Sequence, residues 1–239
     1  MPIKAILFDM FDTLMMIEKD HEFYAPSIRR MYRYLCGQGV DVPFERFEQA
    51  YIEERNKLFA VADLHFEEPH FNVRVAATLR ALGYSYDVSS PIVTAATCEF
   101  CEEFSKYVKI DDDAEATLKA LKANYRLGMI SNFAIPECVL KLLKTGGVDR
   151  FFDVIVVSGA VNRRKPHEEI FKSTLKLMNL KADETVFVGD TIDADIEGAK
   201  AIGMSAIYIE RRSQKASQKY LPDRTIKRLS QLPAALLGL

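Results

Sequence analysis

The fold of this chain is decided by the stretch Ile3-Lys-Ala-Ile-Leu-Phe-Asp-Met-Phe-Asp-Thr-Leu14. Its apolar part, from Ala5 to Phe8, runs without alternation and stops at Asp9. An unbroken apolar run of this length is typical of a strand that is buried on both faces of a sheet. A carboxylate just past such a strand would lie at the C-terminal edge of the sheet, where open α/β folds bind ligands.

Two later stretches repeat this pattern. The apolar run at 126–130 ends at Ser131, and the run at 185–189 ends at Asp190. A segment with the apolar spacing of a helix follows each of the three runs. If the three strands are parallel and adjacent, Asp9, Ser131 and Asp190 converge on one small volume.

The second half of the chain alternates short apolar runs with helical segments. Strands are predicted at 127–130, 151–157, 186–188 and 205–209, and helices at 114–124, 136–145, 166–178 and 193–202, with one more helix or turn at 225–237. Strands separated by helices of this length predict a parallel sheet covered on both faces, which is an α/β, Rossmann-like core. The polar stretch 211–219 is predicted to be a mobile surface loop.

The stretch from residue 16 to residue 107 interrupts this alternation and holds no convincing strand. Prolines in first turns, glycines at ends and apolar residues at helical spacing predict four helices, which begin near Pro26, Pro43, Phe71 and Pro91. We therefore expect an all-helical insert at 16–107, and a core formed by 1–15 together with 108–239.

Composition limits the possible partners. The 239 residues are enough for one large or two modest domains, and the formal net charge is −2. Without a basic excess we expect neither nucleic acid nor an anionic membrane as a partner. The sequence has no apolar run long enough to span a bilayer and no signal-peptide pattern, which favours a cytoplasmic protein. We expect a monomer or a homodimer.

The cysteines suggest no metal or redox centre. Cys98 and Cys101 form a C-x-x-C, but no second pair exists to complete a zinc site. The pair also lies within a predicted helix rather than at the start of one after a strand. We expect two half-buried thiols that lie one turn apart.

Two carboxylates at one sheet edge repel each other unless a cation neutralises them. Mg²⁺ takes oxygen ligands, usually one or two carboxylates together with water and substrate phosphate. Asp9 and Asp190 therefore predict a Mg²⁺ site, and Asp195, at the start of the following helix, is placed to hold the metal or its waters.

Further groups near this edge suit attack by a carboxylate. Lys165 precedes a proline, so its backbone is expected to be extended, and its side chain can reach back to the carboxylates and to a phosphate. Hydroxyl groups come from Thr13 and Ser131, and backbone N–H groups from the region of Met10 and Phe11. Such a set matches nucleophilic attack by an Asp with charge stabilisation around the electrophile.

These motifs resemble those of the haloacid dehalogenase (HAD) superfamily of hydrolases. Residues 9–13 resemble the first motif, Ser131 at a strand end the second, Lys165-Pro166 the third and Gly189–Asp195 the fourth. All four occur in the order that the family has them. The helical insert after the first motif resembles the mobile cap of the family.

The resemblance implies a role for each matched residue. Asp9 would be the nucleophile, Ser131 would hold the phosphoryl oxygens and Lys165 would balance charge. The metal set would be Asp9, the backbone carbonyl of Phe11, Asp190 and, in support, Asp195. Substrate contacts are expected from Met10, Phe11 and Asn132, and Tyr24, Arg29, Arg55 and His65 of the insert are candidates for facing the substrate.

One position departs from the family pattern. The phosphatases of the family place a second Asp two residues after the nucleophile, where it protonates the leaving oxygen and then activates water. Here that position is Phe11, and Asp12 takes the place of the usual Gly. A missing general acid/base costs about 10²–10⁴-fold in rate. Because successive side chains of an extended chain point to opposite sides, we do not expect Asp12 to reach the leaving group.

Phe11 and Asp190 favour different reactions. Family members that hydrolyse 2-haloacids also lack the second Asp, because a halide leaves without a proton, and aromatic residues are common there. Those metal-free enzymes, however, lack a carboxylate at the place of Asp190. With Asp190 and Asp195 weighed above Phe11, we expect a Mg²⁺-dependent phosphatase that acts on a small phosphate ester through an aspartyl-phosphate at Asp9. The alternatives are a metal-independent 2-haloacid dehalogenase without a cofactor, and a catalytically weak protein that binds a phosphorylated metabolite or a partner protein.

Overall fold

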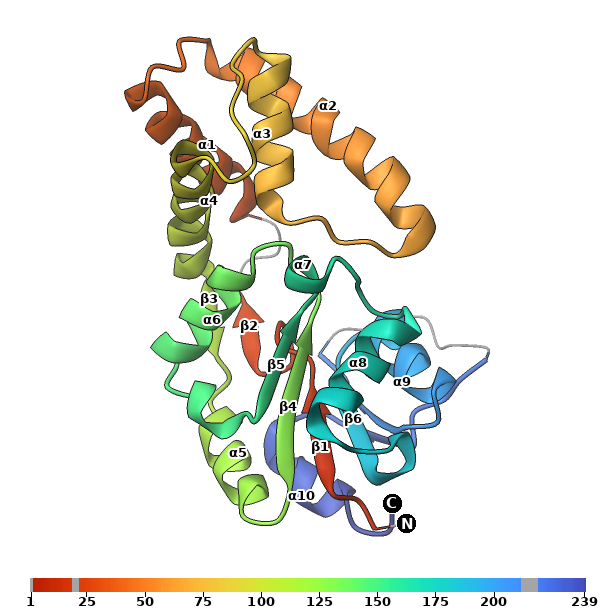
Figure 1. Cartoon of the computed structure of the whole chain (residues 1–239). Coiled ribbons are helices and arrows are strands. Elements are labelled where there is room, and N and C mark those ends of the chain that lie inside the picture. Colours follow the sequence, from red (N-terminus) through yellow and green to blue (C-terminus); the bar gives the residue numbers. More distant parts are fainter. Residues whose placement is uncertain (1, 19–21, 212–218) are drawn as a thin grey trace.

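The core of the molecule is a six-stranded parallel sheet with the strand order β5-β4-β1-β6-β7-β8 (Figure 1). The computed structural model describes residues 2–18, 22–211 and 219–239. The strands of the sheet are β1 (Ala5–Phe8), β4 (Arg126–Ser131), β5 (Val154–Val157), β6 (Thr185–Gly189), β7 (Ser205–Ile209) and β8 (Arg224–Ile226). The predicted α/β class and parallel sheet are confirmed. The loop predicted at 211–219 lies, except for its end residues, outside the described residues.

The central position of β1 explains why its sequence dominates the fold. It pairs with β4 on one side and with β6 on the other, so that Phe8 lies opposite both Met129 and Val188. The residues that follow these positions therefore meet at one edge of the sheet. Within β1, Ile6 and Phe8 point into one apolar cluster, and the two residues that alternate with them point into a second cluster on the other face.

Helices cover both faces of the sheet. One face is packed by α5 (Ala114–Lys122), α6 (Pro136–Thr145) and α10 (Leu232–Ala235), and the other by α8 (Glu168–Met178) and α9 (Glu197–Ala201) (Figure 1). The four-residue helix α7 (Ser158–Val161) follows β5 at the carboxyl edge. Within the described part of the chain, no helix combines the length and the apolar character needed to cross a lipid bilayer.

The insert forms a helical cap beyond the carboxyl ends of the strands (Figure 1). Its helices are α1 (Tyr24–Gly37), α2 (Phe44–Ala62), α3 (Phe71–Ala81) and α4 (Pro91–Phe104), with a 3₁₀ turn, η1, at Asp63–His65. All four predicted helices of the insert are present. The boundaries at residues 16 and 107 stay a prediction.

A two-stranded antiparallel ribbon connects the cap to the core. It pairs β2 (Met15–Ile17) with β3 (Val108–Ile110). The prediction that no strand occurs between residues 16 and 107 is therefore wrong for Met16 and Ile17. Strands of three residues are too short to show a periodic pattern, so this ribbon could not be predicted from the sequence.

Several predicted element boundaries differ from the observed ones. Helix α1 begins two residues before Pro26, and α8 begins two residues after Pro166. The predicted helix at 193–202 opens instead with a π-helical turn, Ile192–Ile196. The remaining 3₁₀ turns are Ser105–Tyr107, Asp149–Phe151, Ala182–Glu184 and Leu229–Gln231. The tail, predicted as one helix or turn from residue 225, forms β8 before the short α10.

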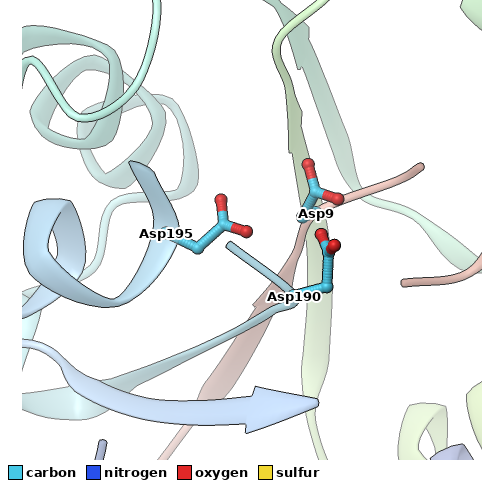
Figure 2. Close-up of side chains that lie close together, drawn as sticks. All are labelled: Asp9, Asp190 and Asp195. Atoms are coloured by element: carbon cyan, nitrogen blue, oxygen red, sulfur yellow. The ribbon is translucent and has the colours of Figure 1, made fainter. Parts of the chain in front are cut away.

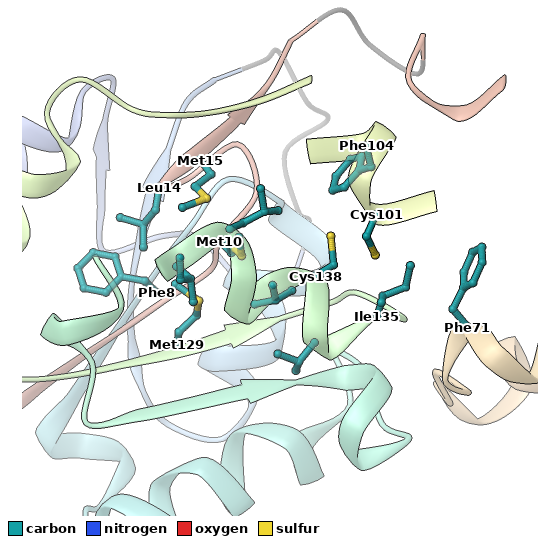
Figure 3. Packing of buried hydrophobic residues seen from close by; sticks show 14 of the residues in the cluster. Phe8, Met10, Leu14, Met15, Phe71, Cys101, Phe104, Met129, Ile135 and Cys138 are labelled. Carbon is teal, nitrogen blue, oxygen red and sulfur yellow. The ribbon is translucent and has the colours of Figure 1, made fainter. Parts of the chain in front are cut away.

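The cysteines differ from the expectation of two half-buried thiols. Cys98 is exposed, whereas Cys101 is buried and faces Cys138 of α6 (Figure 3). A hydrogen bond with Cys138, together with burial, raises the pKa of the Cys101 thiol. The cap and the core thus share one apolar cluster, which also includes Phe71 and Phe104 of the cap.

Candidate active site

Three carboxylates meet at the carboxyl edge of the sheet. Asp9 follows β1, Asp190 follows β6, and Asp195 lies on the π-helical turn that begins two residues later (Figure 2). One oxygen from each lies within 4.8 Å of the others, and all three residues are buried. The predicted convergence of Asp9 and Asp190 is therefore present in the structure.

The π-helical turn orients Asp195 toward the other two carboxylates. Its backbone N–H donates to the carbonyl of Thr191 at 2.9 Å, and its Oδ2 accepts from the backbone N–H of Thr191 at 3.0 Å. Both hydrogen bonds join Asp195 to the backbone of Thr191, and they fix the backbone and the carboxylate of Asp195 at the start of the turn. It lies directly against Gly189, the last residue of β6.

Lys165 lies between two of the carboxylates. Its Nζ is 2.6 Å from Asp9 Oδ1 and 2.7 Å from Asp195 Oδ1, and it also donates to the Ile130 carbonyl at 2.9 Å. Asn132 fixes the backbone of this lysine, since its amide accepts from Lys165 N at 2.9 Å and donates to Lys165 O at 3.0 Å. Asn132 therefore positions Lys165, and it also lines the cavity beside Asp9.

Burial and the crowding of negative charge raise the pKa values of two of the three carboxyl groups. Burial, followed by the nearby charge of Asp9, raises the pKa of Asp190 to about 8. Burial also raises the pKa of Asp195 to about 6, although Lys165 opposes the shift. When all three carboxylates are ionised, as a bound cation would favour, the one ammonium group of Lys165 leaves two negative charges uncompensated. Oxygen ligands with this residual charge fit a hard divalent cation such as Mg²⁺.

The two hydroxyls predicted to bind the phosphoryl group are buried, and their contact with a phosphoryl group stays a prediction. The side-chain oxygens of Thr13 and Ser131 are buried and have no hydrogen-bond partner among the described residues. The Met10 carbonyl accepts from Leu14 N at 2.8 Å and from Met15 N at 2.9 Å, which folds the chain back after β1. Buried hydroxyls without a partner suit a ligand that brings acceptor oxygens.

Phe11 lines the same cavity of about 200 Å³ as Asp9, but its ring belongs to an aromatic group between cap and core. The ring centroid is 5.0 Å from that of Phe133 and 5.6 Å from that of Phe104 of α4. The use of the Phe11 carbonyl as a metal ligand stays a prediction.

The extended backbone assumed for Asp12 is not observed, whereas the expectation that its side chain does not reach the leaving group stays a prediction. Asp12 lines the cavity together with Asp9. The backbone of Asp12 has a φ of 54°, so the chain is not extended there and the alternation of side chains does not apply. Its Oδ1 accepts from the backbone N–H of Ile17 at 3.1 Å, which ties the site to β2 of the connecting ribbon.

A second cavity of about 190 Å³ adjoins the first, and Asn132 lines both. Of the four cap residues suggested by the sequence, Tyr24 lines this cavity, whereas Arg29, Arg55 and His65 do not. Sequence reasoning missed Arg74 of α3 and Glu68, which both line it. The sequence signal available for Arg74 was that it is the one charged residue on the buried face of the helix predicted to begin near Phe71.

The cap is docked onto the core beside these cavities. The backbone N–H of Arg164 donates to the Phe66 carbonyl, and that of Phe71 donates to the Ala134 carbonyl, both at 2.9 Å. The Arg164 guanidinium also pairs with Asp63 of η1. The loop that carries Lys165 therefore contacts the cap directly.

Comparison with known sequences agrees with this geometry. Residues 3–203 match the family model of the haloacid dehalogenase-like hydrolases. A glyceraldehyde 3-phosphate phosphatase of Methanocaldococcus jannaschii is 32% identical over 96% of this chain and 95% of its own length. The enzyme of the same name from Pyrococcus abyssi is 32% identical over 87% of this chain and 82% of its own length.

Solved structures share the fold. A 2-haloacid dehalogenase from Pseudomonas syringae superposes with a TM-score of 0.74, at 24% identity and 98% coverage of both chains. A HAD phosphatase from Thermococcus onnurineus gives a TM-score of 0.66, at 24% identity and 99% coverage of both chains. The family model, the sequence relatives and the four motifs in order lead to one conclusion. The chain belongs to the haloacid dehalogenase-like hydrolase family.

Proposed function

We propose that the protein is a Mg²⁺-dependent phosphatase that hydrolyses a small phosphate ester through a phosphorylated Asp9. The observation that carries this proposal is the arrangement around Asp9, where three clustered carboxylates, Asp9, Asp190 and Asp195, have only Lys165 as a cation beside them and so suit a divalent metal ion. The names of the sequence relatives make glyceraldehyde 3-phosphate the first substrate to test. We place the enzyme in the cytoplasm, as a monomer or a homodimer.

The residues divide the reaction between them. Lys165 holds Asp9 Oδ1 and so orients the carboxylate that attacks phosphorus. The ester P–O bond breaks as the Asp9–phosphorus bond forms, and the leaving alkoxide takes a proton from water because Phe11 offers none. Water then attacks phosphorus, which releases inorganic phosphate and restores Asp9. Bound Mg²⁺ would offset the charge of the carboxylates and of the phosphoryl group.

Thr13 and Ser131 supply the phosphoryl contacts in this proposal. Both hydroxyls are buried at the carboxyl edge and have no partner in the described part of the chain, so phosphoryl oxygens would satisfy them. Asn132 contributes indirectly, through the backbone of Lys165.

The dehalogenase alternative fits the site less well. Phe11 is compatible with loss of a halide, but the substrate would be a carboxylate that must approach Asp9, Asp190 and Asp195. Without a cation, the carboxylates of the site would still carry more negative charge than Lys165 balances, and this charge would repel the substrate. The sequence relatives over most of the chain are phosphatases by name, whereas the dehalogenase structure at 24% identity shares the fold alone.

The test is hydrolysis of glyceraldehyde 3-phosphate and of an aryl phosphate, each with Mg²⁺ and with a chelator. We expect phosphate release that requires Mg²⁺ and is lost in the Asp9→Asn variant. The same variant is the control for spontaneous breakdown of the substrate. Chloride release from 2-chloropropionate that a chelator leaves unchanged would instead establish the dehalogenase. Binding of phosphate esters without turnover, equal in Asp9→Asn, would establish the binding protein.

A further inference from the structure

We propose that Arg74 recognises the alcohol part of the substrate and selects phosphate esters whose alcohol carries an aldehyde or carboxylate oxygen. The inference rests on the proposed function and adds a substrate class to it. It concerns the second cavity, between α3, α4 and the loop after β4, and not the carboxylate site itself.

The position of the second cavity suits the part of a substrate that leaves with the alcohol. Asn132 lines this cavity and the one that holds Asp9, so a phosphate ester at Asp9 would extend past Asn132 into it. Its volume of about 190 Å³ equals that of about six water molecules. Rings of Tyr24, Phe71 and Phe133 form much of its wall. The cavity therefore admits a short alcohol and excludes a large one.

Arg74 brings to this wall a positive charge on which the nearby charge of Glu68 acts, but which no carboxylate of the described residues contacts in an ion pair. The residue is 9% exposed, and its Nε is buried without a hydrogen-bond partner. Its one hydrogen bond runs from Nη1 to the hydroxyl of Tyr51 at 3.1 Å, and no carboxylate of the described residues lies within 4.0 Å of the guanidinium. Burial of a charge without a counter-ion is costly, so a partner supplied by the ligand is expected.

The surroundings of Arg74 hold the guanidinium in place without neutralising it. Its central carbon lies 5.0 Å from the ring centroid of Phe71 and 4.9 Å from that of Phe59. Burial raises the pKa of Tyr51, so that phenol stays neutral and contributes no negative charge. A fixed, planar guanidinium offers paired N–H donors, which match the geometry of a carboxylate or a carbonyl oxygen.

Glu68 shares the cavity but does not form an ion pair with Arg74. Its Oε2 lies 4.0 Å from Arg164 Nη1, and burial raises the pKa of its carboxyl. Glu68 is thus placed to accept a hydrogen bond from a hydroxyl group of the substrate. Together the two side chains fit an alcohol with a hydroxyl beside an aldehyde or a carboxylate.

Three substrates with the same three-carbon skeleton test this inference. Glyceraldehyde 3-phosphate, 3-phosphoglycerate and glycerol 3-phosphate differ at one carbon, which carries an aldehyde, a carboxylate or an alcohol. We expect Arg74→Met to lower kcat/KM for the first two by about 10- to 100-fold, the loss typical of one hydrogen bond to a charged group. Glycerol 3-phosphate and an aryl phosphate should change less than about threefold, and Arg74→Lys should restore part of the loss.

Arg80→Met is the matched control, because Arg80 lies on the same helix and is exposed. It should leave every substrate unchanged. An equal loss on all substrates in Arg74→Met would show that Arg74 only supports the fold, and no loss on any would show that it does not contact the alcohol. Either result overturns the inference while leaving the phosphatase proposal intact.

Binding separates this inference from the proposed function. In an Asp9→Asn background, calorimetry should show that Arg74→Met weakens 3-phosphoglycerate binding about tenfold and leaves glycerol 3-phosphate binding unchanged. This result would support the Arg74 contact even if the wild type hydrolysed no phosphate ester. Equal weakening of both ligands, or of neither, would overturn it.

Discussion

The side chain of Asp195 fills the space that a methyl group on Gly189 would need. A Cβ built on Gly189 would lie 2.3 Å from Asp195 Oδ2 and 2.5 Å from its Cγ. The end of β6 and the π-helical turn can therefore approach this closely only because residue 189 is Gly. This close approach brings Asp195 to Lys165 and to the other two carboxylates.

We predict that Gly189→Ala displaces Asp195 and lowers Mg²⁺-dependent activity by about 10- to 100-fold, as loss of a supporting contact at a metal site does. The fold should persist, because the clash falls on one side chain. Gly37→Ala is the control, since a Cβ on Gly37 would meet no atom within 4 Å. Steady-state kinetics of both variants, with circular dichroism, measure this effect. Full activity in Gly189→Ala would contradict the role given to Asp195.

Mg²⁺ should stabilise the folded protein through the three carboxylates. A ligand at about 100 times its Kd adds about 2.7 kcal/mol to the free energy of unfolding, so the melting temperature should rise on titration with Mg²⁺. Asp190→Asn should remove this rise. Asp193→Asn should keep it, because Asp193 is exposed and, among the described residues, its side chain bonds only to the N–H of Ala194, at 2.9 Å. Equal rises in the two variants would place the metal elsewhere.

Asp113 links the start of α5 to the C-terminal segment and predicts a pH dependence. Hydrogen bonds from Arg228 and Ser230 lower the pKa of Asp113 to about 2. An unfolded chain has an Asp pKa near 3.9, so the stabilisation is complete above about pH 4 and is lost as the pH falls to about 2. Asp113→Asn should be less stable than the wild type at pH 7, and the difference should shrink between pH 4 and pH 2.

Urea unfolding at several pH values measures this difference. Asp112→Asn is the control, because Asp112 is exposed and the same charge is removed beside Asp113. If the difference in the free energy of unfolding between the wild type and Asp113→Asn stayed constant down to pH 2, it could not come from the ionised carboxylate of Asp113.

The sequence predicted the core of the site because the signal was local. Buried parallel strands appear as unbroken apolar runs, and the residues that end them, Asp9, Ser131 and Asp190, necessarily meet at one edge. The reach of Lys165 back to Asp9 was predicted for a similar reason, since the proline after it disfavours a helix at that position.

The features that the sequence did not predict depend on contacts between distant segments. Arg74 is buried against Tyr51 and Phe59 of the neighbouring helix α2, and Cys101 meets Cys138 between the cap and the core. The backbone of Asp12 was assumed to be extended, because a positive φ cannot be read from the sequence pattern. The ribbon of β2 and β3 joins segments 90 residues apart in short strands, for which no periodicity exists.

We predict that Phe11 limits the leaving groups that the enzyme accepts. It takes the sequence position at which phosphatases of the family carry a second Asp, and an alkyl alkoxide needs a proton from that Asp far more than an aryl oxide does. We predict that Phe11→Asp raises the ratio of alkyl to aryl phosphate hydrolysis at least tenfold. This is a cautious figure, because a general acid typically contributes about 10²–10⁴-fold to the rate. The variant should also lose stability, since each aromatic contact with Phe104 and Phe133 contributes about 0.5–1.5 kcal/mol.

Phe11→Asn separates the two effects of that substitution. It removes the same ring and nearly matches Asp in size, but it brings no acidic proton. Stability should fall in both variants, whereas the alkyl-to-aryl ratio should rise only in Phe11→Asp, and only when Mg²⁺ is present. Equal ratios in the two variants would mean that residue 11 does not face the leaving oxygen. Another group would then have to supply the proton, and Asp12, whose carboxyl also lines the cavity, would be the next candidate to test.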